Sequence, residues 1–359
     1  MFLETPTSRA EQLASATIMA TALFSAAKVW HYYRKHSKER EYHLLLDRIP
    51  PKSISDFEEA AMIHLSPLAR VYFQFFAEKN SSTYQGHRQF VDSIRLSPTI
   101  LTGDVRNIDT TLEIFGQRLE MPVWIAPTAF HVLACKDGEI ATAKGAEAAG
   151  VGYCYNWMLS SKHHMEVFPP NVQMKKQWLH LYMYEERDLV EASIRAALKT
   201  DQFAAIILTC DHPHIRVQNR MMPFFTTADM PHANLDDYFF PNQAAVGFDT
   251  TTLRQLLDPT KIEGSPGGKN SSQLSWDDVK WIKSCVPSNM PIVAKGILTA
   301  EDAIRAIDAG IDAIVVSNHG GRQCDIAVPA MEALPVIGLL WQVGSQFWLI
   351  LGYARLGTL

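Results

Sequence analysis

Residues 314–325 read Ile-Val-Val-Ser-Asn-His-Gly-Gly-Arg-Gln-Cys-Asp, and this stretch decides the fold class of the chain. A short β-branched run that ends in a polar cluster is typical of a buried parallel strand whose carboxyl end opens into a loop. The glycines allow the backbone to approach a ligand closely, the histidine can exchange a proton near neutral pH, and the arginine can hold a carboxylate with two hydrogen bonds. We therefore expect a strand that delivers reactive side chains to a binding site.

Similar apolar runs precede this strand and alternate with helical patterns. We expect strands at residues 123–126, 151–155, 178–184, 204–209, 292–294 and 314–317. Helices are expected at residues 138–149, 165–167, 188–198 and 300–309, with Asp137 and Thr299 as N-caps of the first and the last. This alternation predicts βαβ units and a parallel sheet, most simply an α/β fold of the (β/α)8 TIM-barrel type. Active sites of such barrels form at the carboxyl ends of the strands.

The last part of the chain is unusually apolar. Residues 333–354 carry no charge and are long enough to span a bilayer. Pro335, Gly338 and Gly344 interrupt the run, so a helix followed by a buried strand at residues 347–351 is the favoured interpretation.

The composition argues against some classes of partner and site. The net charge of −5 over 359 residues gives no reason to expect a nucleic acid partner. The five cysteines form no CxxC pair, so reduced thiols in an intracellular chain are expected. Neighbouring histidines occur as His163 with His164 and as His212 with His214, without carboxylate or cysteine partners at metal-ligand spacing. We interpret them as surface or loop histidines and expect no metal site.

Residues 1–52 form a predicted extension, and residues 53–359 form the predicted barrel domain. The extension holds an uncharged stretch at residues 13–27, shorter than the roughly 20 residues of a spanning helix. A targeting segment, a membrane anchor and a surface helix all remain open, and membrane association through residues 13–30 is the less favoured interpretation. Residues 226–275 are rich in Asn, Asp, Pro, Gly and Ser and predict a mobile loop over the active site.

Several blocks of the chain together resemble one enzyme family. They are residues 127–129, 136–144, 181–184, 208–211, 274–279, 291–303 and 317–322. On these blocks the chain is similar to the FMN-dependent 2-hydroxy-acid oxidases and dehydrogenases, the glycolate oxidase group. The resemblance implies FMN as the cofactor and the oxidation of a small L-2-hydroxy acid to the 2-oxo acid.

The resemblance and the side-chain chemistry together assign roles at the strand ends. His319 suits the base that takes the substrate proton, Asp211 can hold its imidazole in one orientation, and Lys295 can offset negative charge on a reduced flavin. The expected substrate-binding residues are Tyr182, Arg216, His319 and Arg322. The expected cofactor-binding residues are Pro127, Thr128, Ala129, Asn156, His180, Thr209, Lys295, Ser317 and Arg355.

The chain departs from the family pattern at several positions. Phe75 stands where the family has its first substrate tyrosine, so a hydroxyl is expected to be lost. Asn156 replaces a serine, and His180 replaces a glutamine that faces the flavin, which changes the geometry of the donor. Residues 349–358 resemble a degraded seventh strand and its loop, and the family's eighth strand with its Gly-Arg phosphate site is lacking. We therefore expect a barrel that is incomplete after strand 7.

An incomplete barrel leaves alternatives for the function. A truncated FMN enzyme is the leading hypothesis. A non-catalytic remnant that serves as a subunit of a hetero-oligomer is the second, and an incomplete gene product is the third. We expect the folded chain to form homo-oligomers. Peroxisome and mitochondrion both remain open as compartments, since the chain ends in Gly-Thr-Leu and carries no clear peroxisomal signal.

Overall fold

A computed structural model describes residues 52–74, 82–101, 103, 106–168, 171–173, 177–184, 186–212, 241–247, 274–340 and 348–351. Several predictions fall outside these residues. They concern the extension up to residue 51, most of the loop at 226–275, and the side chains of Phe75, Arg216 and Arg355.

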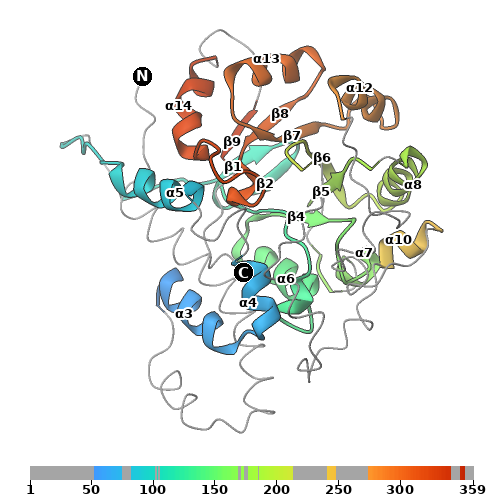
Figure 1. The fold of residues 1–359 in the computed structure, drawn as a ribbon, viewed down its shortest axis with the longest axis horizontal. Helices are drawn as coiled ribbons and strands as arrows, with labels where there is room; N and C mark the ends of the chain where they lie inside the picture. Colours follow the sequence, from blue (N-terminus) through green and yellow to red (C-terminus); the bar gives the residue numbers. More distant parts are fainter. Residues whose placement is uncertain are drawn as a thin grey trace, which may run out of the picture.

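The centre of the molecule is a sheet of seven strands that lie in chain order, each parallel to the next. Helices lie outside this curved sheet (Figure 1). The strands are β3 (Trp124–Ile125), β4 (Gly152–Asn156), β5 (Gln177–Tyr182), β6 (Phe203–Thr209), β7 (Ile292–Ile297), β8 (Ala313–Val316) and β9 (Trp348–Leu351). The α/β barrel class and the position of each predicted strand are confirmed. Among the described residues no strand joins β9 to β3, so the sheet is open.

Side chains of the central strands alternate between two apolar layers, as the two-residue period of a strand requires. One layer, which includes Leu179, Leu181 and Ile206, packs under the helices. The other holds smaller side chains such as Ala205 and Val293, together with Trp178. A two-stranded hairpin of β1 (Leu112–Ile114) and β2 (Gln117–Leu119) packs against this inner layer. Phe115 lies in the turn of this hairpin, and its ring is 5.7 Å from that of Trp178. Because Trp178 is near the start of β5, the hairpin lies at the amino ends of the strands, and the carboxyl ends remain available for a site.

The helices expected at residues 138–149, 165–167, 188–198 and 300–309 are present. They are α3 (Ile54–His64), α4 (Pro67–Phe73), α5 (Ser82–Ser93), α6 (Glu139–Ala149), α7 (His164–Val167), α8 (Arg187–Leu198), α10 (Pro241–Ala245), α12 (Trp276–Ser284), α13 (Ala300–Asp308) and α14 (Ala330–Leu340), with the 3-10 turns η1 (His131–Leu133) and η3 (His319–Gly321). Thr299 caps α13 by accepting a hydrogen bond from the Asp302 amide, as expected.

The expected cap at Asp137 is wrong. Gly138 is the N-cap of α6, with φ of 51°, and no side chain caps the helix. A glycine at this turn permits a backbone conformation that a side chain would oppose, so the chain enters α6 through backbone geometry instead of an aspartate cap.

The apolar run near the end of the chain forms α14 and then β9, which confirms a helix followed by a strand. Within the described ranges, no helix combines the length and the apolar character that a bilayer crossing requires. Part of the predicted loop at 226–275 forms α10, and its buried Asn242 donates a hydrogen bond to the hydroxyl of Tyr155 at 2.7 Å. All five cysteines are free thiols.

Candidate active site

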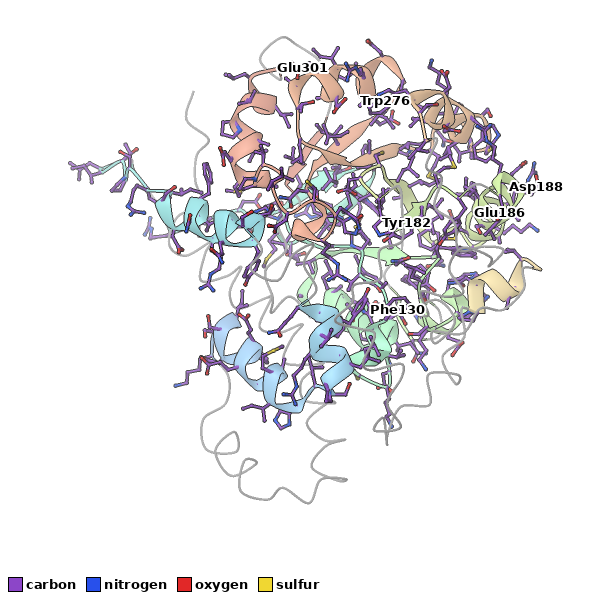
Figure 2. The ribbon with its side chains drawn as sticks, in the orientation of Figure 1. Phe130, Tyr182, Glu186, Asp188, Trp276 and Glu301 are labelled. Atoms are coloured by element: carbon purple, nitrogen blue, oxygen red, sulfur yellow. The ribbon has the colours of Figure 1, made fainter. Side chains whose placement is uncertain are left out.

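The carboxyl ends of β5 to β8 bring the predicted reactive residues into one row. Tyr182 ends β5 and pairs in register with Thr209 at the end of β6, and Thr209 pairs with Lys295 of β7. Asp211 follows β6, and His319 follows β8. Figure 2 shows Tyr182 near the middle of the molecule, where these strand ends meet. The sheet therefore gathers residues that are far apart in the sequence.

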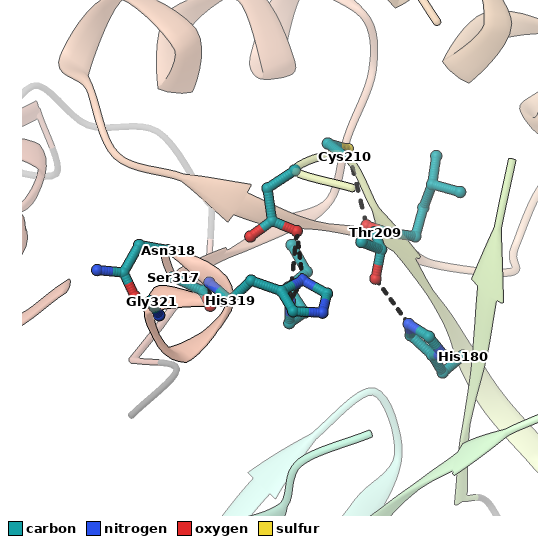
Figure 3. A network of polar contacts seen from close by, with 10 residues as sticks. His180, Thr209, Cys210, Ser317, Asn318, His319 and Gly321 are labelled. Carbon is teal, nitrogen blue, oxygen red and sulfur yellow. Dashed lines mark hydrogen bonds and ion pairs between the residues drawn. The ribbon is translucent and has the colours of Figure 1, made fainter. Parts of the chain in front are cut away.

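His319, Asp211 and Lys295 form a compact polar cluster. The Nδ1 atom of His319 lies 3.0 Å from Oδ1 of Asp211, and Nζ of Lys295 lies 3.4 Å from the same oxygen (Figure 3). Lys295 Nζ is also 3.2 Å from His319 Nδ1. The three side chains are only 11% to 15% exposed. The contacts therefore take place largely away from water, where charges act strongly on one another.

Nδ1 of His319 lies between a carboxylate and an ammonium group. An ionised carboxylate only accepts hydrogen bonds, so the contact with Asp211 at 3.0 Å favours a proton on Nδ1, while the donor-only ammonium of Lys295 makes the longer contact of 3.2 Å. The Nε2 atom then carries the lone pair of the neutral ring. A neutral imidazole with a free lone pair on Nε2 can accept a proton at that atom.

The electrostatic environment keeps Asp211 charged and His319 neutral. Burial alone would raise the pKa of Asp211, but the charge of Lys295 and the hydrogen bond from His319 outweigh it and hold the pKa well below its usual value. Burial, and next the charge of Lys295, lower the pKa of His319 below 6.5, against the opposing effect of Asp211. At neutral pH the imidazole is therefore an unprotonated base beside a carboxylate.

The loop after β8 holds His319 in an uncommon backbone conformation. His319 has φ of 58°, and its amide donates a hydrogen bond to Oγ of Ser317 at 3.1 Å. The side-chain oxygen of Asn318 accepts from the Gly321 amide and pairs at 2.9 Å with Nε2 of His87, a buried residue of α5. Left-handed backbone at a residue other than glycine is strained and persists only when neighbouring contacts hold it, as they do here.

Close packing of β7 against Asp211 requires a glycine. Gly296 has φ of 111°, and a Cβ atom at this position would lie 2.5 Å from Cβ of Asp211. The amide of Cys210 also donates to the carbonyl of Lys295 at 2.8 Å. The backbone on both sides of Asp211 is thus fixed against β7.

The residues expected to bind the cofactor lie beside this cluster. His180 pairs through Nε2 with Oγ1 of Thr209 at 2.6 Å (Figure 3). Nδ1 of His180 is buried and has no hydrogen-bond partner among the described residues. Asn156 is the register partner of His180 on β4, and its side-chain oxygen accepts from the Leu159 amide at 3.0 Å. Burial, and next the charge of Lys295, hold the pKa of His180 well below 6.5, so its ring is neutral.

The chain that follows β3 carries the remaining cofactor-binding expectations. Pro127, Thr128 and Ala129 lead from β3 into η1, and the Thr128 hydroxyl donates to the carbonyl of Ala126 at 3.1 Å. Ser317 is buried at the end of β8. Arg355 and Arg216 lie outside the described residues, so the structure does not place them.

Arg322 lies against α4, which the sequence did not assign to the site. Its Nη1 donates to the carbonyl of Tyr72 at 3.1 Å, and its guanidinium carbon lies 5.0 Å from the centroid of the Tyr72 ring. The Tyr72 ring in turn contacts Phe130 edge-on, with 5.2 Å between centroids. Tyr72 belongs to the aromatic run at residues 72–76, and this run was the available sequence signal. The sequence-based expectation concerned only Phe75 of this run, as the position of the family's first substrate tyrosine.

His212 is a second residue that the sequence did not assign to the site. It was interpreted as a surface or loop histidine. It does lie in the loop after β6, and its ring lies 5.1 Å from the ring of His319 and 5.2 Å from that of Tyr182. Burial lowers the pKa of His212 to about 3. Its position directly after Asp211 was the available signal.

Comparison with known proteins agrees with the predicted resemblance. Residues 61–351 match the model of the FMN-dependent dehydrogenase family. An L-lactate oxidase of Nostoc sp. is 35% identical over 298 residues, which cover 80% of this chain and 75% of the relative. A peroxisomal (S)-2-hydroxyacid oxidase of Arabidopsis thaliana is 31% identical over 284 residues, 79% of this chain and 72% of the relative.

A similar crystal structure is that of a lactate oxidase of Pediococcus acidilactici. It matches with a TM-score of 0.67 at 27% identity, over 83% of this chain and 74% of that one. The chain therefore belongs to the FMN-dependent dehydrogenase family, is an oxidoreductase and uses FMN as its cofactor.

Proposed function

We propose that this chain oxidises a small L-2-hydroxy acid to the corresponding 2-oxo acid, with His319 as the base. The observation that carries the proposal is the contact of His319 Nδ1 with Asp211, which leaves Nε2 to accept the proton. The positive charge that then develops on the imidazole is stabilised by the ionised carboxylate of Asp211. Lys295 keeps that carboxylate ionised and holds it in place.

Arg322 and Tyr182 would bind the substrate carboxylate. A guanidinium offers paired donors that match the two oxygens of a carboxylate. Burial raises the pKa of the Tyr182 hydroxyl well above 10, so the phenol stays protonated and can donate a hydrogen bond. We include Arg216 in the substrate-binding set because the family resemblance requires a second cation.

The polar groups beside the base fit FMN. The buried Nδ1 of His180 has no partner among the described residues, and a polar cofactor ring would supply one. We propose that His180, Thr209, Lys295, Ser317 and Asn156 hold FMN together with the backbone of residues 127–129 and with Arg355. FMN, when bound, supplies the acceptor for the two electrons that leave the substrate.

We extend the proposal to the organisation of the chain. Residues 53–359 would form the catalytic domain, with residues 226–275 as its mobile loop and residues 1–52 as an extension. The peroxisomal relative favours a peroxisome over a mitochondrion, and imaging of the tagged full chain tests this compartment. Homo-oligomers are expected, and the mass of the purified chain in solution tests them.

Anaerobic reduction of the purified flavoprotein tests the function. The full chain should show bound flavin absorbance, and L-lactate or glycolate should bleach it. His319→Asn should bind FMN but lose reduction, because asparagine tolerates the left-handed backbone of this position and lacks the base. His163→Asn is the matched control, since it makes the same exchange at an N-cap of α7 where asparagine is also suitable.

Two results would contradict the proposal. One is a wild-type chain whose bound flavin no 2-hydroxy acid reduces. The other is rapid flavin reduction in the His319→Asn variant. This result would refute the role of His319 as the base, but it would not affect the membership of the chain in the family.

A further inference from the structure

We propose that His212 forms a wall of the substrate pocket and restricts the side chain carried by C2 of the hydroxy acid. This inference rests on the proposed function and adds a size limit to it. The wall would favour substrates in which C2 bears hydrogen or a methyl group over those that bear a phenyl ring or a long alkyl chain.

The position of the His212 ring is the first argument. The ring lies 5.1 Å from that of His319, with 33° between the planes, and 5.2 Å from that of Tyr182. His319 must reach the proton of the substrate, and Tyr182 must reach its polar groups. A ring in contact with both of these residues would border the space in which the proposed mechanism puts C2 of the substrate.

The second argument is that the backbone leading into His212 is held in place. The preceding residue, Asp211, contacts both Lys295 and His319, and Gly296 packs closely against it. The Cys210 amide is bonded to the Lys295 carbonyl. A side chain on such a fixed strand end is a rigid boundary, and rigid boundaries discriminate by size.

The third argument is the charge of the ring. Among the described residues, the titratable groups near His212 are His319, Asp211, Lys295 and Tyr182. Burial and the neighbouring positive charges keep the imidazole neutral. A neutral ring does not attract the substrate carboxylate, so its contribution is shape, and Arg322 remains the cation that suits the carboxylate.

The test compares substrates in variants of the FMN-loaded full chain. His212→Ala should raise kcat/KM for L-mandelate relative to L-lactate by about tenfold or more, the scale on which pocket contacts discriminate. His212→Phe keeps a ring of similar size and should retain the wild-type ratio. Binding of the products gives a second readout: phenylglyoxylate should perturb the flavin spectrum of His212→Ala at lower concentration than that of the wild type, while pyruvate should not.

The outcomes separate the wall from the function. If the wild type oxidises lactate and the ratio is the same in His212→Ala and the wild type, the wall is refuted and the function stands. If no 2-hydroxy acid reduces the wild-type flavin, the proposed function is refuted and the wall with it. Should His212→Ala not fold, His212→Thr is judged by the same ratio, because threonine also removes the ring.

Discussion

Replacing Asp211 by asparagine isolates the electrostatic part of the proposed mechanism. Asparagine has the shape of aspartate, so the packing against Gly296 should be preserved. The variant removes the negative charge that lies 3.0 Å from Nδ1 of His319. It leaves the positive charge of Lys295 at 3.2 Å from the same atom. The imidazolium that forms during the reaction then faces a cation without its counter-charge.

The expected loss follows from Coulomb's law. With an effective dielectric constant of about 20, two unit charges about 3 Å apart interact by roughly 5 kcal/mol. The proton is only partly transferred in the transition state, so about half of this energy is expected to be lost. Since about 1.4 kcal/mol corresponds to a factor of ten, flavin reduction should slow by roughly 100-fold.

Stopped-flow reduction of the flavin under anaerobic conditions measures the effect. Asp277→Asn is the matched control, because the Asp277 side chain is 85% exposed and, among the described residues, forms an ion pair only with Lys280 of its own helix. The decisive comparison repeats Asp211→Asn in the His319→Asn background. Asp211 acts through His319, so the second substitution should add little there. An equal loss in both backgrounds would refute the reasoning, and so would a single variant that reduces flavin at the wild-type rate.

Three further outcomes are expected. The rate of flavin reduction should fall as the pH drops below 6.5, because the lowered pKa of His319 keeps the base neutral above that value; a rate that rises toward acid would contradict the assignment. His212 takes up its proton in the unfolded chain near pH 6.5 but in the folded chain only near pH 3, so its stabilisation is present above pH 6.5 and is lost as the pH falls toward 3. Denaturant titrations should therefore show a weaker dependence of the free energy of unfolding on pH in His212→Phe, by at most about 1.4 kcal/mol per pH unit; an unchanged slope would show that His212 titrates normally. Gly296→Ala should destabilise the fold by about 2 kcal/mol or more, because it combines a positive φ with a clash against Asp211. Gly247→Ala is the comparison, since Gly247 also has a positive φ but no described atom lies within 4 Å of an added Cβ; equal losses would show that the clash at Gly296 is relieved.

The sheet was predictable from the sequence because each strand is a compact apolar run followed by a polar residue. The run at residues 204–209 is an example, since it forms β6 and delivers Asp211. The start of α6 was less predictable, because a glycine in an uncommon backbone conformation replaced the side-chain cap expected at Asp137. Such a choice depends on tertiary contacts that local sequence patterns do not encode.

Some site residues could be predicted from the sequence and others could not. Residues at strand ends, such as Lys295 and His319, could be placed together because the carboxyl ends of parallel strands share one edge of the sheet. Tyr72 and His212 could not be assigned to the site, because their contacts depend on how α4 and the loop after β6 pack in three dimensions. A pattern in the sequence gives the strand on which a residue lies, but not which ring it will face.

The hydrogen bond between His87 and Asn318 links the His319 loop to α5, a helix that comes before the first strand of the central sheet in the sequence. Ser82 and Thr83, at the start of α5, also bond to Asp325 just beyond the loop. A transient opening of α5 would therefore release the loop while the sheet stays folded. Under mild denaturant, catalytic competence should then vanish before the strands lose their amide protection, and hydrogen exchange would register α5 and the His319 loop as one cooperative unit.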